Sequence, residues 1–204
     1  MSEITNIELQ KKDETRVNLY LDDKFYAGIS LELVMKHQLK KGMELDKAFL
    51  DEIILEDEKG KAFDKALKYI SSTLKTTRQI RDYLRKKEYN PQTIDYVIDK
   101  MQEYKYLNDT AYANAFIATY SNKYGKLKLI SALKSKGVSD KVIDEVFASD
   151  DLKMENSIEA TAEKYLRHKE RTNETYMKLS RCLYSRGYDF DDIKSCINKL
   201  KGRD

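Results

Sequence analysis

The chain has 204 residues, of which 36% are charged and 41% hydrophobic, with one proline, seven glycines and a net charge of +3. This composition is typical of a helix-rich folded chain, and the length allows one sizeable core or two to three small units. No stretch approaches the apolar length of a membrane span, and the N-terminus lacks the charged-then-apolar order of a signal peptide, so we expect no membrane association and a cytoplasmic location.

The cysteines and histidines argue against metal and disulfide chemistry. Cys182 and Cys196 are fourteen residues apart without a CxxC motif, and the only histidines are His37 and His168. Neither a disulfide framework nor a zinc site fits this spacing. We therefore expect no cofactor and no metal.

Residues 1–30 are predicted to form an antiparallel sheet. Apolar residues alternate with other residues on both sides of a turn at residues 22–24: Val17, Leu19 and Leu21 before it, and Phe25, Ala27 and Ile29 after it. Ile7 and Leu9 suit an earlier strand. Because a lone hairpin is marginal in water, this sheet is expected to pack on the segment that follows.

That segment is predicted to be helical. Ser30 is a plausible N-cap for a short helix over residues 31–39, which the sequence "KKG" at 40–42 closes. Residues 49–70 then lead into the repeats through linking helices, with a break expected at Gly60.

From residue 62 the chain repeats one three-helix unit three times. Each unit has a leading helix (61–72, 109–123, 157–169), a basic second helix (74–87, 126–136, 176–186) and a more acidic third helix (91–101, 139–149, 189–200). The predicted organisation is a β-rich extension over 1–61, followed by repeats over 62–107, 108–156 and 157–204. Stacked repeats predict a mainly α protein with an elongated, curved shape.

The repeats align without gaps from the second helix to the third. The shared apolar positions are Ile80/Leu129/Leu179, Leu84/Leu133/Leu183, Tyr89/Val138/Tyr188, Ile94/Ile143/Ile193, Val97/Val146/Cys196 and Ile98/Phe147/Ile197. Their spacing puts them on one helix face, so Cys196 is predicted to be a core residue. The turn position is Glu88/Gly137/Gly187, and the cap position of the third helix is Asn90/Ser139/Asp189. A single irregular helical bundle, with hairpins alike by chance, is the alternative.

Positive charge is concentrated in the three second helices. They contain thirteen basic residues and one acidic residue, Asp82. The thirteen are the candidate partner-binding residues: Lys75, Arg78, Arg81, Arg85, Lys86, Lys87, Lys126, Lys128, Lys134, Lys136, Lys178, Arg181 and Arg186. If repetition brings these helices to one side, they form a positive strip that fits a long anionic object.

Other interpretations of the same segments remain open. The basic helices could be solvated faces with ordinary charge pairing, although pairing would interleave the signs within each helix. A DNA-reading helix–turn–helix is disfavoured because the third helices begin with acidic turns, so any DNA contact should reach the backbone through the second helices. Five tyrosines could stack on bases but are more simply core or core-edge residues: Tyr69, Tyr83, Tyr96, Tyr112 and Tyr165. No phosphate-loop motif or acid–base constellation is present, so we expect no enzymatic activity.

Several stretches resemble the RecX family of bacterial recombination regulators. They are "YLNDTAYANAFI" at 106–117, Gly125 followed by "LISALKSKGVSDKVIDEVF" at 129–147, and "YMKLSRCLYSRGYDFDDIKSCI" at 176–197. The N-terminal "ITNIELQKKDETRVNLYLDDKF" and "LKKGMEL" are similar to the extension of RecX proteins in low-GC Gram-positive bacteria. The chain departs from the family pattern at Asn108, where aspartate is common, and at Glu88, where the turn glycine is common.

The resemblance implies tandem three-helix repeats that bind the RecA recombinase. Family members lodge in the groove of the RecA filament on single-stranded DNA and limit its ATPase, strand exchange and persistence, in DNA repair, recombination and the SOS response. We accordingly expect a monomeric, non-enzymatic regulator that binds RecA through the basic second helices. The alternative is a sequence-nonspecific protein that binds single- or double-stranded DNA through backbone contacts without RecA.

Overall fold

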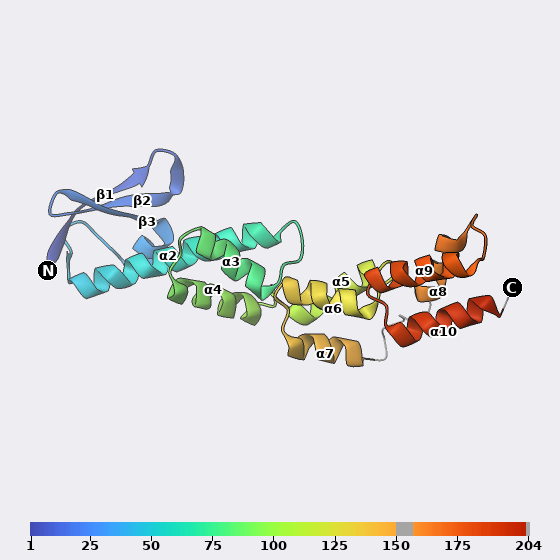
Figure 1. Ribbon diagram of the computed structural model, residues 1–204. Coiled ribbons are helices and arrows are strands. Elements are labelled where there is room, and N and C mark those ends of the chain that lie inside the picture. The colour runs from blue at the N-terminus through green and yellow to red at the C-terminus, as the bar shows by residue number, and fades with distance from the viewer. Residues whose placement is uncertain (150–156, 203–204) are drawn as a thin grey trace. The chain divides into compact units, whose positions relative to one another are not determined.

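The computed structural model describes residues 1–149 and 157–202 (Figure 1). The expected boundary between the second and third repeats, at 156/157, and the last two residues of the chain therefore involve residues outside the described part. The described residues form two compact units, one of residues 1–72 with 81–103 and one of residues 73–80 with the chain from 104 onward. The predicted fold class, mainly helical repeats after an N-terminal antiparallel sheet, is confirmed.

The N-terminal sheet has four strands in the order β3-β2-β1-β4. Their bounds are β1 Ser2–Gln10, β2 Asp13–Leu21, β3 Lys24–Ser30 and β4 Glu44–Leu45. Val17, Leu19 and Leu21 are buried on one face, as their alternation predicts, and Asp22 and Asp23 adopt the positive φ angles of a tight hairpin turn. β4 was not predicted, because a two-residue strand carries no alternation.

Two helices complete the core of this part of the chain. α1 (Leu31–Lys36) begins at Ser30, whose side chain accepts a hydrogen bond from Leu33 N–H, so the predicted cap is confirmed. α2 (Lys47–Ile70) runs unbroken through Gly60, so the expected break is wrong. A glycine inside a helix costs only about 1 kcal/mol relative to alanine, and the helix packs on both the sheet and the first repeat (Figure 1).

A buried carboxylate joins α2 to the sheet. Asp57 accepts hydrogen bonds from Arg16, 3.0 Å away, and from the backbone N–H of Ser30 at 2.8 Å, and Lys61 lies 2.7 Å away. Burial disfavours the charged carboxylate, but the hydrogen bonds from Arg16 and Lys61 outweigh that cost and lower the pKa of Asp57. The linking helix is thereby fixed to strand β2.

The repeats contain eight further helices among the described residues. They are α3 (Thr77–Lys86), α4 (Pro91–Glu103), α5 (Asp109–Tyr120), α6 (Lys126–Ser135), α7 (Asp140–Ala148), α8 (Ser157–Leu166), α9 (Asn173–Ser185) and α10 (Phe190–Lys201). The leading helix of the first repeat is the second half of α2 and has no start of its own. α9 begins three residues earlier than predicted, because Thr172 accepts a hydrogen bond from Thr175 N–H and caps it.

The shared positions of the repeats behave alike in all three copies. Residues at the aligned apolar positions are buried or partly buried, and Cys196 is in the core of the third repeat as predicted. Glu88, Gly137 and Gly187 all have positive φ angles. The side chains at the cap position each accept a backbone N–H of the third helix, as for Asn90 and Thr93 N–H at 2.8 Å. Asn108 caps α5 in the same way, so the departure from aspartate preserves the cap.

Within the second unit, adjacent repeats join through the turn glycine. A Cβ atom on Gly187 would lie 2.4 Å from the backbone nitrogen of Lys128, and one on Gly137 would lie 2.4 Å from the Cβ of Arg78. Backbone hydrogen bonds accompany the approach, with Gly125 N–H donating to Arg186 O at 2.9 Å. Each turn therefore packs against the start of the preceding repeat's second helix. Glu88 belongs to the first repeat, where no repeat precedes it, and its side chain is exposed.

Candidate partner-binding surface

The predicted residues of the first repeat lie on α3 and beside its ends: Lys75, Arg78, Arg81, Arg85, Lys86 and Lys87. Two of these arginines pair with acidic side chains, one from α4 and one from α3 itself. Arg81 donates to Asp95 of α4, and Arg85 lies 2.8 Å from Asp82. These pairs are exposed and worth about 0–1 kcal/mol each, so a partner anion can displace them.

The second repeat presents its four predicted lysines on and just after α6: Lys126, Lys128, Lys134 and Lys136. Lys134 Nζ lies 2.7 Å from Asp140 of α7, and this hydrogen bond raises the pKa of Lys134 above its ordinary value. The ammonium groups of the other three lie over aromatic rings, Lys126 over Phe147 at 5.4 Å, Lys128 over Tyr124 at 4.7 Å and Lys136 over Phe116 at 5.7 Å. Cation–π attraction therefore holds these three charges against aromatic neighbours.

The third repeat holds Lys178, Arg181 and Arg186 on and at the end of α9. Lys178 lies 2.7 Å from Glu174, whose hydrogen bond raises the pKa of Lys178. Arg186 is half-buried at the joint between repeats, where its carbonyl accepts Gly125 N–H. Arg181 is exposed and makes no ion pair with any residue in 1–149 or 157–202. It is therefore the most available of the three charges.

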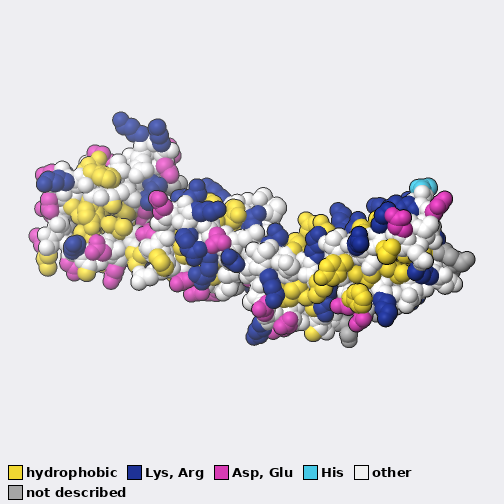
Figure 2. Space-filling model, viewed as in Figure 1, with side chains coloured by type: hydrophobic (Ala, Val, Ile, Leu, Met, Phe, Trp, Pro, Cys, Tyr) yellow, Lys and Arg dark blue, Asp and Glu magenta, His cyan; other side chains and the backbone are white. Residues whose placement is uncertain are grey.

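The sequence did not predict how much of this charge is paired. Asp95 and Asp140 come from the third helices, and Glu174 lies ahead of the predicted start of the last basic helix, so counting signs within the predicted helices could not reveal them. The sequence also missed a set of exposed apolar side chains on the same helices. Leu127 of α6 is 52% exposed and Met177 of α9 is 58% exposed. Figure 2 shows hydrophobic side chains gathered on the viewed face over α6 and α9.

The interpretation of five tyrosines as core or core-edge residues holds for four of them. Tyr69, Tyr83, Tyr112 and Tyr165 are half-buried, and the rings of Tyr69 and Tyr83 stack with centroids 4.2 Å apart. Tyr96 is exposed, so that assignment is wrong. Tyr96 comes two residues after the buried Ile94 on α4, and that spacing directs its side chain away from the buried face of the helix.

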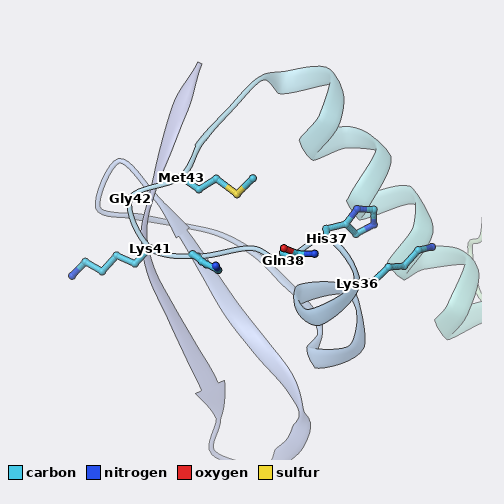
Figure 3. Close-up of a pocket in the computed structure, with 7 residues that line it drawn as sticks. Lys36, His37, Gln38, Lys41, Gly42 and Met43 are labelled. Atoms are coloured by element: carbon cyan, nitrogen blue, oxygen red, sulfur yellow. The ribbon is translucent and has the colours of Figure 1, made fainter.

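An open hollow lies beside α1 and is lined by residues 36–38 and 40–43. Figure 3 shows Lys41 pointing away from it, while Lys36 and His37 point toward α2. Both of the latter reach Glu56, with His37 Nε2 2.9 Å from its carboxylate, and the hydrogen bond from Lys36 lowers the pKa of Glu56. The residues that line the hollow include no carboxylate, since Glu56 is not among them, so the hollow offers no constellation for acid–base chemistry.

Residues 1–149 and 157–202 show neither a metal-ligand cluster nor a membrane-spanning helix. No group of three or more His, Cys, Asp or Glu side chains is placed to hold a metal ion. Among the helices described there, none combines the length and apolar character that a bilayer-spanning segment requires.

Comparison with known proteins gives a consistent result along the chain. Residues 2–46 match the regulatory protein RecX N-terminal domain, and residues 62–101, 108–146 and 155–197 match the first, second and third RecX three-helix domains. The regulatory protein RecX of Clostridium tetani is 38% identical over 205 residues, covering 98% of this chain and 95% of that protein. The chain belongs to the RecX family.

Other RecX proteins extend the comparison. The regulatory protein RecX of Bacillus subtilis is 34% identical, covering 97% of this chain and 77% of the relative. A crystal structure of regulatory protein RecX aligns with a TM-score of 0.76 at 23% identity, covering 98% of this chain and all of that chain. RecX from Lactobacillus salivarius aligns with a TM-score of 0.64 at 25% identity over 72% of this chain and 98% of that one. The sequence resemblance to RecX is confirmed.

Proposed function

We propose that this RecX-family chain binds the RecA recombinase and its filament on single-stranded DNA, and that it inhibits the filament's ATPase and strand exchange. It acts in the cytoplasm, as a monomer and without catalysis, in DNA repair and recombination. Its family membership supports a regulatory role, since its relatives carry the name regulatory protein RecX.

The observation that carries the proposal is the recurrence of basic side chains on the second helix of every repeat. Thirteen basic residues lie on or beside α3, α6 and α9. A filament of protein on DNA repeats its anionic groups along its length, so a binder that repeats its cations can make several weak contacts at once. In this proposal the repeats over 62–107, 108–156 and 157–204 bind the filament, and the extension over 1–61 braces the first repeat.

The direct test measures binding and inhibition together. The protein is pulled down with RecA in the presence and absence of ATP and single-stranded DNA, and DNA-dependent ATP hydrolysis by RecA is followed as the protein is titrated. Retention on the RecA filament and falling ATPase activity are expected. Failure to bind RecA under every condition would overturn the proposal.

A charge-reversal pair tests the placement of the surface. Lys86→Glu with Arg181→Glu changes two exposed cations of the second helices. Lys11→Glu with Lys12→Glu is the matched control, because it reverses two exposed lysines at the β1–β2 turn. We expect the first pair to weaken inhibition several-fold and the control to leave it nearly unchanged. Equal loss in both would mean that only net charge matters.

The second candidate is sequence-nonspecific DNA binding without RecA, and the same basic helices favour it. Binding to phosphates alone weakens steeply with salt, whereas a protein interface with apolar contacts is less sensitive. Titration against bare single-stranded DNA and against RecA-coated DNA at two salt concentrations separates the candidates. Equal affinity for both, with equal salt dependence, would favour the DNA-binding candidate.

A further inference from the structure

The third repeat differs from the second at two surface positions next to the hairpin turn. Lys134 and Asp140 of the second repeat form an ion pair, with 2.7 Å between Lys134 Nζ and Asp140 Oδ1. The gap-free alignment places Tyr184 and Phe190 at the equivalent positions of the third repeat. Tyr184 is 68% exposed and Phe190 is 67% exposed. The third repeat therefore has two solvent-exposed aromatic rings where the second repeat has a solvent-exposed ion pair.

Helix α9 carries an exposed apolar side chain and an exposed cation on the same face as Tyr184. Met177, Arg181 and Tyr184 follow at spacings of four and three, so they share one outward face of the helix. Met177 and Tyr184 are exposed, and Arg181 between them has no ion pair within residues 1–149 and 157–202. Methionine, arginine and aromatic residues are the side chains enriched at protein–protein interfaces and at their energetic centres.

The charges near Phe190 favour a protein over a nucleic acid. Asp189 and Asp191 flank Phe190, and Asp192 follows on the first turn of α10. Three carboxylates at this end would repel a phosphate backbone, whereas a protein surface can meet them with its own cations. Arg181, by contrast, would pair with an acidic group of the partner.

We propose that a docking patch for the RecA protomer is formed by Met177, Arg181, Tyr184 and Phe190. The rings of Tyr184 and Phe190 insert into an apolar pocket of RecA that has charges of both signs at its rim. The inference rests on the proposed function and adds to it a protein-contact site that shares Arg181 with the cationic surface and differs from the rest of that surface by its exposed apolar side chains. The basic side chains of α3 and α6 then supply long-range attraction, and the patch on the third repeat supplies short-range apolar binding.

The second repeat provides the test variant. Tyr184→Lys with Phe190→Asp installs the ion pair that residues 134 and 140 form in the equivalent place, so we expect the fold to tolerate it. The matched control is Tyr104→Ala with Tyr106→Ala, which removes another pair of exposed aromatic rings, 6.1 Å apart, from the same unit. Thermal unfolding followed by circular dichroism checks that each variant is folded.

Affinity for RecA filaments assembled on single-stranded DNA is measured by fluorescence anisotropy, alongside affinity for the bare DNA. We expect the Lys/Asp variant to bind the filament at least about 30-fold more weakly, as for loss of an interface centre, and the control less than threefold more weakly. Affinity for bare DNA should change less than threefold in both.

Each other outcome identifies what fails. If the unaltered protein does not bind RecA filaments, the proposed function and the patch fail together. If it binds and the Lys/Asp variant binds equally well, the patch is refuted while the proposed function stands. If the variant loses affinity for bare DNA and for filaments by the same factor, the rings stack on bases and the protein-docking assignment is overturned.

Discussion

Substitution of Gly187 by alanine tests the joint between the second and third repeats. Gly187 has φ +83°, which costs an alanine about 1–2 kcal/mol. Its new Cβ would lie 2.4 Å from the backbone nitrogen of Lys128, so the turn must move away. That movement breaks the hydrogen bonds from Gly125 N–H to Arg186 O at 2.9 Å and from Leu127 N–H to Gly187 O at 3.1 Å. Two such bonds contribute about 1–3 kcal/mol, which brings the expected loss to about 2–5 kcal/mol.

Hydrogen exchange locates this loss at the joint. The amides of Gly125 and Leu127 should exchange faster in Gly187→Ala, while amides inside α2 keep their protection. Urea unfolding measures the free energy. Gly60→Ala is the control, since nothing lies within 4 Å of the added methyl group in a helix interior, and it should stabilise the protein by about 0.5–1 kcal/mol. If Gly187→Ala changes the free energy of unfolding by less than about 0.5 kcal/mol and both amides stay protected, the reasoning is refuted.

Three further outcomes are expected. Asp57→Asn should lower the free energy of unfolding by about 2–3 kcal/mol, because it removes the buried carboxylate charge that pairs with Arg16 and Lys61. Asp64→Asn on the exposed side of the same helix should change it little. Because the pKa of Asp57 is lowered below 3.8, its contribution to the free energy of unfolding is fully present above about pH 4 and is lost as pH falls through the native pKa. The stability difference between the unaltered protein and Asp57→Asn should therefore shrink below about pH 4 in acid titrations. Glu88→Gly should raise the unfolding temperature, since it relieves the cost of about 1 kcal/mol for a side chain at φ +64°, and no rise would indicate a compensating contact of Glu88.

Much of the fold was predictable because the chain writes its repeat three times. Agreement between copies identifies buried positions that single segments leave ambiguous, and this is how Cys196 could be assigned to the core. The cap side chains Asn90, Ser139 and Asp189 were predictable because capping depends on local chemistry. Gly60 was misjudged for the opposite reason: whether a helix continues through glycine depends on tertiary packing that the sequence does not display.

The candidate surface was less predictable than the fold. The basic side chains could be found by counting, but Asp95 and Asp140 approach them from other helices, and such pairing depends on three-dimensional packing. Tyr184 and Phe190 could have been noticed by asking where the copies disagree at a surface position, since their equivalents in the second repeat are charged. Their exposure could not be inferred without the structure, because aromatic residues in a helical hairpin are usually buried.

The unbroken helix α2 has a consequence for how the protein can be dissected. Its first half buries Leu50 and Ile53 against the sheet, and its second half buries Ala62 and Ala66 and packs on α4. Between them, Glu58 accepts a hydrogen bond from Asn90 at 2.9 Å. A fragment that starts at residue 62 would lack the first half of α2 and would remove part of the helix that packs on the first hairpin. Truncations meant to isolate the repeats should therefore start before Asp46, and even these would expose the apolar side that the sheet now covers.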